Sequence, residues 1–545
     1  MKKTLTILTM ALIVPVADVR ADDSFDSFMK EATSDFDSFI DDAHRDFISF
    51  MRNPWKKFDA RKPIVKHTSP KPEIPIKYTP PESPTQDIIV RQTPEPTTDG
   101  STAPETKTSP DAAPAAIPAA PIAEIPVPPN RPAVPVKPRK PATPATGHGN
   151  QPVKVPTPSA SEAVPETRRP VKTTPQTEPE KAGALYTGAP GRDRFTYGGI
   201  DYYLSNGLKN TIRLSSLDEN AIADAYEKLL KSDYRPIIDD LKTLQKDDLR
   251  NEWALFMLVR QIAESYAGDN ESKVMRQFLL NQLGYQARVA RIAGENRLSL
   301  FVAPDCALYG CIYVEENGSR FYDVDAKKPY AFYMCKKDSP SGITKIKMEA
   351  SAHPRLKGNS VTSTHRSETL PTSVSVAVPK ALIDFYAQYP QCDYQVYARA
   401  AVDTQTSTTV LDALRPAIAG KSEREAAGIL LDFVQTGFKY ATDNEQFGFE
   451  KPFFVEELFY YPYCDCEDRS ILYRYLVKNL LGLDVVLLDY PNHIATAVRF
   501  NSDTPGDYVN VGNSRYVICD PTYIGAGIGT AMPMFKNTAP KILRY

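Results

Sequence analysis

The stretch from Tyr461 to Ser470 reads Tyr-Pro-Tyr-Cys-Asp-Cys-Glu-Asp-Arg-Ser and predicts a loop that runs directly into a helix. Apolar residues then recur at helical spacing until the helix ends at Leu481. Asp465 suits the N-cap position, and Asp468 adds an acidic side chain to the first turn. This pattern places Cys466 in the first turn of a partly buried helix. Unpaired N–H groups and the helix dipole favour a thiolate over a thiol at that position.

Two later strands carry the other residue types that a nucleophilic thiol requires. His493 opens a predicted strand that runs to Phe500, and a further strand, Tyr516 to Cys519, leads into Asp520. A thiol nucleophile needs a base, and the base needs an orienting group. Because Cys466, His493 and Asp520 all sit at the ends of elements, their side chains can converge. The order predicts a catalytic Cys-His-Asp triad.

These motifs resemble the transglutaminase-like superfamily, whose members share a papain-like Cys-His-Asp triad. The resemblance covers about the last third of the chain and rests on Cys-Glu-Asp at 466–468, His493 before a strand and Asp-Pro-Thr at 520–522. It implies an α+β module in which a helix bearing Cys466 packs on an antiparallel sheet bearing His493 and Asp520.

An oxyanion formed at this site would need hydrogen-bond donors. The backbone N–H of Cys466 is one. The polar Gln446, which lies upstream within an aromatic loop, is a candidate second donor and is equally compatible with a plain loop residue. No metal and no cofactor are part of this prediction.

Three other interpretations of the same residues stay open. Cys464, Cys466 and His493 could bind a metal with Cys519 or Asp520, although structural zinc sites usually space their cysteines more widely than Cys-x-Cys. Cys464 and Cys519 could form a disulfide beside the site. Neighbours on a strand point to opposite faces, so Cys519 should face the core if Asp520 faces the triad. Finally, the triad could be inert and the fold kept for binding.

Composition restricts the broad class of the protein. The chain has 545 residues, a net charge of −2 and 48 prolines. A nearly neutral chain lacks the basic footprint of nucleic-acid binding, so no nucleic-acid partner is expected. The seven cysteines are an odd number, which leaves at least one thiol unpaired within the chain.

The first residues predict export. Residues 1–21 combine two lysines, a short apolar run and Val-Arg-Ala before the expected cleavage site, which is typical of a signal peptide. An uncleaved anchor is the alternative, but the apolar run is shorter than a membrane span requires. No later segment is long and apolar enough to span a membrane. A periplasmic or extracellular location is therefore expected.

Residues 22–60 contain an 11-residue repeat in which Phe25, Phe36, Phe47 and Phe58 recur. Eleven residues make almost three helical turns, so the repeat predicts an amphipathic helix with a phenylalanine stripe. The helix could pack on its own catalytic domain, self-associate, or dock on a partner. Its acid-rich polar face argues against anionic lipid and favours an envelope protein as that partner.

Residues 61–194 are expected to form a disordered Pro-rich linker, since 29 of the 48 prolines fall between 62 and 182. Such a linker could serve as a spacer through a cell-envelope layer. A ligand for a Pro-recognising domain has no support beyond composition.

The remaining sequence predicts a duplicated fold. A degenerate module at 195–354, a polar connector at 355–375 and a catalytic module at 376–545 are expected, and coincidence between two α+β modules is the alternative. The aligned pairs are Leu283-Gly284 with Leu481-Gly482, Gly268 with Cys466, Asn296-Arg297-Leu298 with Asn492-His493-Ile494, and Asp323 or Asp325 with Asp520. The first module lacks the cysteine and the histidine and should perform no thiol chemistry.

Two functions of different class follow from these patterns. One is an exported thiol-dependent acyl-transfer enzyme, a cysteine peptidase or amidase that acts on an envelope or extracellular protein or peptide, with Gln–Lys cross-linking as the less favoured reaction. The other is a non-catalytic envelope-associated binding or assembly protein that uses the phenylalanine-repeat helix and an inactive transglutaminase-like scaffold.

Overall fold

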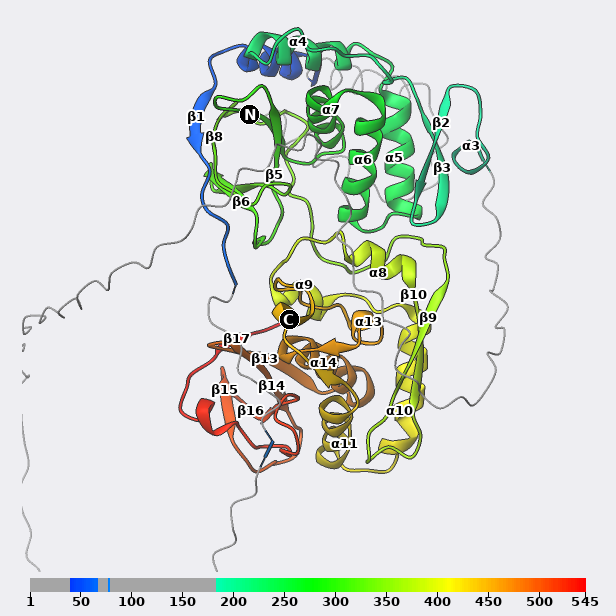
Figure 1. The fold of residues 1–545 in the computed structure, drawn as a ribbon, viewed down its shortest axis with the longest axis vertical. Coiled ribbons are helices and arrows are strands. Elements are labelled where there is room, and N and C mark those ends of the chain that lie inside the picture. Colours follow the sequence, from blue (N-terminus) through cyan, green and yellow to red (C-terminus); the bar gives the residue numbers. More distant parts are fainter. Residues whose placement is uncertain (1–39, 67–76, 79–182) are drawn as a thin grey trace, which may run out of the picture. The chain divides into compact units, whose positions relative to one another are not determined.

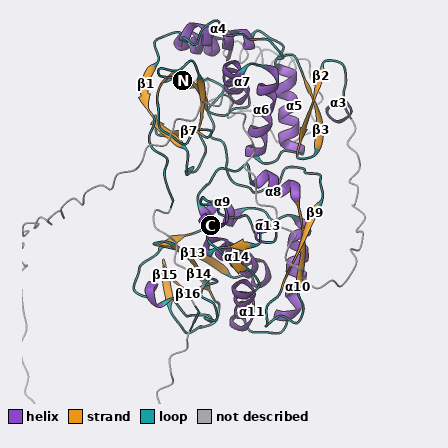
Figure 2. Cartoon of the chain, in the orientation of Figure 1, coloured by secondary structure: helices purple, strands orange, loops and turns teal. Residues whose placement is uncertain are grey.

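The computed structural model describes residues 40–66, 77–78 and 183–545. In these residues the chain is a mixed α+β protein whose two larger sheets are antiparallel, which confirms the expected class (Figures 1 and 2). The expected signal peptide at 1–21 and most of the expected Pro-rich linker lie outside the described residues. None of the described helices combines the length and apolar character needed to cross a bilayer.

The first module, residues 184–334 with an added N-terminal strand, combines a hairpin, helices and a sheet. Its helices are α3 (Ala184–Thr187), α4 (Glu219–Leu230), α5 (Arg235–Asp247), α6 (Glu252–Tyr266) and α7 (Asp269–Gln282). Its strands are β1 (Lys56–Asp59), the hairpin β2 (Arg192–Tyr197) and β3 (Ile200–Ser205), then β4 (Ala287–Ile292), β5 (Leu298–Val302), β6 (Ile312–Glu316), β7 (Ser319–Asp323) and β8 (Ala331–Met334). The sheet has the order β1-β8-β4-β5-β7-β6.

The second module, residues 360–545, also begins with a hairpin. Its helices are α8 (Lys380–Tyr386), α9 (Tyr394–Arg399), α10 (Thr404–Ile418), α11 (Glu423–Thr436), α12 (Asp443–Gln446), α13 (Val455–Leu458), α14 (Cys466–Leu481) and the 3-10 turn η1 (Pro533–Phe535). Its strands are the hairpin β9 (Ser360–His365) and β10 (Val374–Pro379), the short pair β11 (Lys439–Tyr440) and β12 (Tyr463–Cys464), then β13 (Asp484–Tyr490), β14 (His493–Arg499), β15 (Tyr508–Val511), β16 (Ser514–Cys519) and β17 (Lys541–Leu543).

The two larger sheets share one strand order. The second reads β15-β16-β14-β13-β17, and the first reads β6-β7-β5-β4-β8 before β1 is added at its edge. Each sheet is preceded directly by a helix, α7 in the first module and α14 in the second. Strand β5 therefore matches β14, and β7 matches β16. This correspondence fixes which residues of the two modules can be compared.

Each central strand contributes to two separate apolar clusters, because successive side chains point to opposite faces of a sheet. In β13, Val485 and Leu487 join the large core that includes the helices, whereas Val486 and Leu488 join a second cluster that contains Phe535. A comparable second cluster lies on the first sheet and contains Phe301.

Local sequence signals set the ends of the long helices of the second module. Ser422 and Glu425 form the expected capping box at the start of α11. Helix α14 ends as expected at Leu481, where Gly482 adopts a left-handed conformation with φ of 68°. Glycine suits that position because it has no Cβ to clash there.

The expected helix over 22–60 is wrong in its last part. Residues 40–51 are helical, Pro54 prevents continuation, and Lys56–Asp59 form strand β1 against β8. Phe47 is 1% exposed and packs edge-to-face on Tyr226 of α4. Phe47 is thus covered by the first module and not by the catalytic domain that the own-domain alternative expected, whereas Phe50 of the same helix is exposed. Residues 22–39 lie outside the described residues.

Two further expected boundaries are wrong. The polar stretch 355–375 is not a plain connector, because it contains β9, whose alternating Ser, Thr and Val pair with β10. The expected linker 61–194 is also structured at its described ends. Arg61 forms an isolated antiparallel β-bridge with Tyr313. The backbone carbonyl of Ile64 accepts a hydrogen bond from the backbone N–H of Gly310. Folded structure resumes with α3 and β2, before the expected Phe195.

Candidate active site

Cys466 is the first residue of α14, as the sequence predicts, and its side chain is 1% exposed. The carboxylate of Asp468 accepts from the backbone N–H of Asp465 at 3.1 Å, which closes the first turn. The same carboxylate accepts from the backbone N–H of Phe453 at 2.8 Å and so ties the preceding loop to the helix. The acidic first turn thus holds the loop that presents the thiol.

A second carboxylate lies directly at the thiol. The Sγ of Cys466 donates to Oε2 of Glu467 at 3.2 Å, and Glu467 is buried. A carboxylate that accepts from the thiol stabilises the protonated form, whereas the helix N-terminus stabilises the thiolate. Two opposing influences therefore meet at Cys466, and the sequence revealed only the second.

His493 and Asp520 form a direct contact. Nε2 of His493 lies 2.8 Å from Oδ2 of Asp520, and both side chains are buried. The other oxygen of Asp520 accepts from the backbone N–H of Thr522 at 2.9 Å, which fixes the carboxylate. With Nε2 on the aspartate, Nδ1 of His493 has no hydrogen-bond partner among the described residues. That nitrogen is the atom of the imidazole that can exchange a proton.

The ring of His493 is held by aromatic stacking. It lies parallel to Phe535, with centroids 5.0 Å apart and planes at 10°. Asn492, which precedes it, adopts φ of 63° in the tight turn between β13 and β14. The turn and the stack together fix the imidazole at the first residue of β14.

Helix α14 reaches the start of β14 through Ser470. Its Oγ donates to the backbone carbonyl of Ile494 at 2.9 Å. Cys466 lies four residues earlier on α14, hence on the same face one turn toward its N-terminus. The structure therefore brings His493 and Asp520 into contact and places Ser470, one turn after Cys466, at the beginning of β14, while Nδ1 of His493 makes no hydrogen bond to the thiol.

Gln446, the candidate oxyanion donor, is the last residue of α12. Its Nε2 donates to the backbone carbonyl of Tyr463 at 3.4 Å, in the short strand just before the thiol loop. An amide carries two donor hydrogens, so one remains after this bond. The position next to the thiol loop is compatible with the predicted role, and the role stays a prediction.

Two buried polar residues that sequence reasoning missed organise the site. Gln435 on α11 donates through Nε2 to the carbonyls of Asp520, Tyr523 and Ala526 at 2.9, 2.8 and 3.1 Å. Its Oε1 accepts from the backbone N–H of Gly525 at 3.1 Å. Gln435 thereby fixes the loop that begins with Asp520.

Arg469, the second of these residues, is fully buried in the first turn of α14. It donates to the carbonyl of Phe438 at 2.8 Å and lies over the ring of Tyr440. A polar side chain at an otherwise buried helix position was the sequence signal for both residues, but their partners are backbone carbonyls that no sequence pattern reveals.

The alternative interpretations of the cysteines find little support. The structure shows no disulfide among the described residues, which include all seven cysteines. Cys519 faces the large core, as expected for a neighbour of Asp520, and Cys464 lies near the carbonyl of Lys439. Among the described residues, one group of potential metal ligands combines Cys466 with Asp465 and Glu467, two further groups consist of carboxylates alone, and none includes Cys464 or His493. Two of these carboxylates accept from backbone N–H groups, Asp443 from Lys451 and Asp468 from Phe453 and Asp465.

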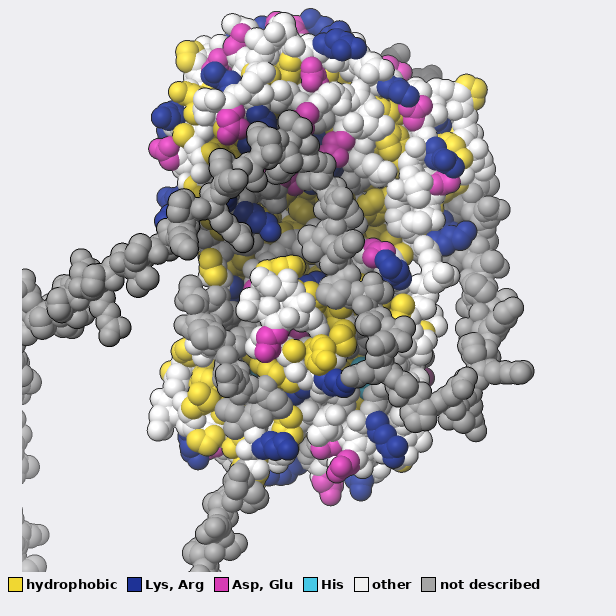
Figure 3. Space-filling model, in the orientation of Figure 1, with side chains coloured by type: hydrophobic (Ala, Val, Ile, Leu, Met, Phe, Trp, Pro, Cys, Tyr) yellow, Lys and Arg dark blue, Asp and Glu magenta, His cyan; other side chains and the backbone are white. Residues whose placement is uncertain are grey.

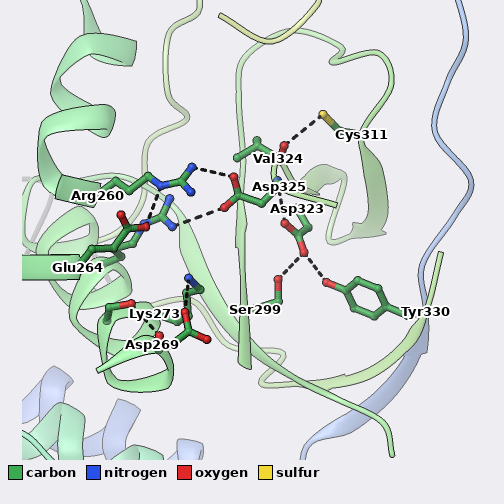
Figure 4. A network of polar contacts seen from close by, with 12 residues as sticks. Arg260, Glu264, Asp269, Lys273, Ser299, Cys311, Asp323, Val324, Asp325 and Tyr330 are labelled. Carbon is green, nitrogen blue, oxygen red and sulfur yellow. Dashed lines mark hydrogen bonds and ion pairs between the residues drawn. The ribbon is translucent and has the colours of Figure 1, made fainter. Parts of the chain in front are cut away.

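Figure 4 shows the two carboxylates of the first module that align with Asp520, and their partners are not histidines. Asp323, the last residue of β7, accepts from the hydroxyls of Ser299 and Tyr330. Asp325 pairs with Arg260 at 2.8 Å and with Arg276 at 3.7 Å. Burial raises the pKa of Asp323. No histidine faces either carboxylate in this described network.

The described surface shows no patch of one charge on the face seen in Figure 3, where basic and acidic side chains are interspersed. This agrees with the nearly neutral composition. No protein-family model, no curated protein and no solved structure matches the chain.

Proposed function

We propose that this protein is a thiol-dependent acyl-transfer enzyme of the transglutaminase-like kind, most simply a cysteine peptidase or amidase. The contact that carries the proposal is the one between Nε2 of His493 and Asp520, 2.8 Å long. It leaves Nδ1 available at the end of the sheet that adjoins the first turn of α14. Helix α14 covers one face of the sheet and the stacked Phe535 lies in the cluster of the other. Cys466 belongs to the helix-side core and the imidazole stacks on Phe535 of the opposite cluster, so the proposal requires the two side chains to meet around the end of the sheet.

In this mechanism, Nδ1 of His493 takes the proton of Cys466, and the thiolate attacks the acyl carbon of an amide. Asp520 holds the imidazole and stabilises its charged form. The backbone N–H of Cys466 and the amide of Gln446 would stabilise the oxyanion. His493 then returns the proton to the leaving amine, and water hydrolyses the thioester. Attack by a lysine amine in place of water would give cross-linking.

We also propose that the two modules arose by duplication. Their common strand order, together with the helix that precedes each sheet, supports a duplication in which the first copy carries hydroxyl and guanidinium partners for its strand-end carboxylates. We also propose that the protein works outside the cytoplasm on protein or peptide substrates. That part rests on residues 1–21, which lie outside the described residues.

One observation favours a second function, a binding scaffold without catalysis. Cys466, His493 and Asp520 are 1%, 1% and 3% exposed, and Glu467 accepts from the thiol. A site closed to solvent with a protonated thiol performs no acyl transfer. The two functions differ in whether the thiol reacts at low pH.

The experiment that separates them is labelling with iodoacetamide across pH 5 to 9, using the chain from residue 22 onward. Burial raises the pKa of Cys464 and Cys311 to about 11 and that of Cys519 to about 12, so these thiols stay silent below pH 7. A Cys306→Ser background removes the partly exposed thiol.

The enzyme proposal expects one fast-labelling thiol at pH 6, lost in Cys466→Ser, slowed in His493→Ala and unchanged in Cys464→Ser. Slow labelling at a rate that His493→Ala does not change would instead support the binding scaffold.

A further inference from the structure

Lys77 and Tyr78, which lie within the expected Pro-rich linker, contact the loop that follows Asp520. Lys77 forms a parallel bridge with Ile524, and the backbone N–H of Tyr78 donates to the carbonyl of Ile524 at 2.8 Å. Ile524 is four residues after Asp520 in the sequence. Lys77 and Tyr78 therefore pair with this loop through one isolated bridge and one backbone hydrogen bond, the kind of main-chain contact that a peptide makes when it adds to a sheet edge.

The side chain of Tyr78 packs on the aromatic cluster that supports the imidazole. Its ring meets Tyr523 edge-to-face, with centroids 5.7 Å apart and planes at 84°. Both belong to or pack against the apolar cluster that contains Phe535, the residue stacked on His493. The place occupied by Tyr78 is thus continuous with the candidate triad.

The loop is fixed from its other side before any peptide pairs with it. Gln435 bonds to the backbone of Asp520, Tyr523, Gly525 and Ala526. None of these bonds involves the carbonyl of Ile524, which instead accepts the hydrogen bond from the backbone N–H of Tyr78. A preformed edge loses little conformational entropy when a peptide binds.

We propose that residues 523–525 form a binding edge for an extended peptide that carries an aromatic side chain, and that the chain's own Lys77-Tyr78 occupies it. The inference builds on the proposed function, because it names the substrate class as an extended aromatic-containing peptide beside the thiol site. Main-chain pairing with Ile524 gives affinity, and the surface formed by Tyr523 selects the aromatic residue. Peptides in solution compete with the tethered Tyr78, whose effective concentration is high.

The test measures binding of a fluorescent peptide with the sequence of residues 73–80, Glu-Ile-Pro-Ile-Lys-Tyr-Thr-Pro. Anisotropy is compared between Cys466→Ser and the double variant Cys466→Ser/Tyr78→Ala, so that no chemistry intervenes. The double variant should bind at least tenfold more tightly, because its own aromatic residue no longer competes.

Two altered peptides serve as controls that leave the protein unchanged. Replacing the peptide's tyrosine with alanine should abolish binding, and N-methylation of that tyrosine should weaken it at least tenfold, since the donor to Ile524 is lost. Equal binding by the two protein variants, no binding by either, or tight binding of the N-methylated peptide would overturn the proposal.

The readout is independent of thiol reactivity. If the labelling experiment fails while the peptide still binds, the enzyme proposal is rejected and the binding-edge proposal stands. If the peptide does not bind while Cys466 is labelled as expected, the binding-edge proposal is rejected and the enzyme proposal stands.

Discussion

Asp323 is the last residue of β7 and Asp520 directly follows the matching strand β16, yet the two carboxylates serve different partners. In the first module, hydroxyl groups of Ser299 and Tyr330 donate to the carboxylate. In the second, the partner is His493, which has a second nitrogen to offer. A hydroxyl donor satisfies a buried carboxylate but cannot relay a proton near neutral pH. The comparison shows that a carboxylate at the end of either strand is satisfied by hydroxyl donors or by an imidazole, and that only the imidazole retains a second nitrogen.

The largest expected effect separates these two carboxylates. Asp520→Asn should slow labelling of Cys466 at pH 6 by about 10²- to 10⁴-fold, because the imidazole loses the group that orients it and stabilises its charge. Asp323→Asn should leave the rate unchanged and lower only stability. The measurement is the pseudo-first-order rate of iodoacetamide labelling for each variant, with folding checked by circular dichroism. Slowing by Asp323→Asn would break the distinction between the modules.

The next effect tests whether residues 40–51 belong to the first module. Phe47 is 1% exposed and Phe50 is 39% exposed, so the same helix offers a buried and a surface phenylalanine. Phe47→Ala should lower the free energy of unfolding by about 3–5 kcal/mol, and Phe50→Ala by less than about 0.5 kcal/mol. Urea unfolding of both variants measures the difference. Equal losses would mean that the stripe is not anchored through Phe47.

A smaller effect concerns Glu456 of the second module. Burial raises its pKa to about 7, although the backbone N–H of Asp403 and the hydroxyl of Tyr386 donate to it. Between its unfolded pKa near 4.5 and this value, the folded state keeps a proton that the unfolded state has lost.

Stability should therefore fall by up to about 1.4 kcal/mol per pH unit as the pH rises from 5 to 7. Chemical denaturation at pH 5, 6, 7 and 8 measures this slope. Glu456→Gln should remove the contribution of one proton from the slope of the unfolding free energy against pH. An unchanged slope in that variant would assign the titration to another group.

A last effect, of similar size, concerns the role of Gln435. Gln435→Ala leaves the carbonyls of Asp520, Tyr523 and Ala526 without this donor and should cost about 1–3 kcal/mol. Gln435→Glu retains the shape but cannot donate, and it should cost at least as much. Hydrogen exchange of residues 520–526, measured by mass spectrometry, should speed up in both variants. Unchanged exchange would show that other contacts hold the loop.

Much of the second module could be predicted because its signals are local. Ser422 with Glu425, Gly482 and the acidic turn around Cys466 each mark a helix end through a bond that spans only a few residues. The placement of His493 at a strand start follows from the tight turn that precedes it.

The missed features depend on partners far away in the sequence. Strand β1 forms because Phe58 faces Phe332 across the sheet, a pairing that no window around the phenylalanine repeat contains. Strand β9 is rich in Ser and Thr, which predicts a connector, because its pairing with β10 is visible only in the fold. Gln435 looked like an ordinary helix residue because its partners are carbonyls about ninety positions later.

The Pro-rich stretch has a consequence that follows from where its flanking residues lie. Residues 56–66 and Tyr78 pair with strands and loops of the same folded unit that resumes at Gly183. A protease cut between 79 and 182 would not release the N-terminal residues. It would yield a nicked protein of two fragments held together by β1 in its sheet, Phe47 in the core and Tyr78 on its loop. Such a cut would appear on a denaturing gel while the protein still migrated as one species under native conditions.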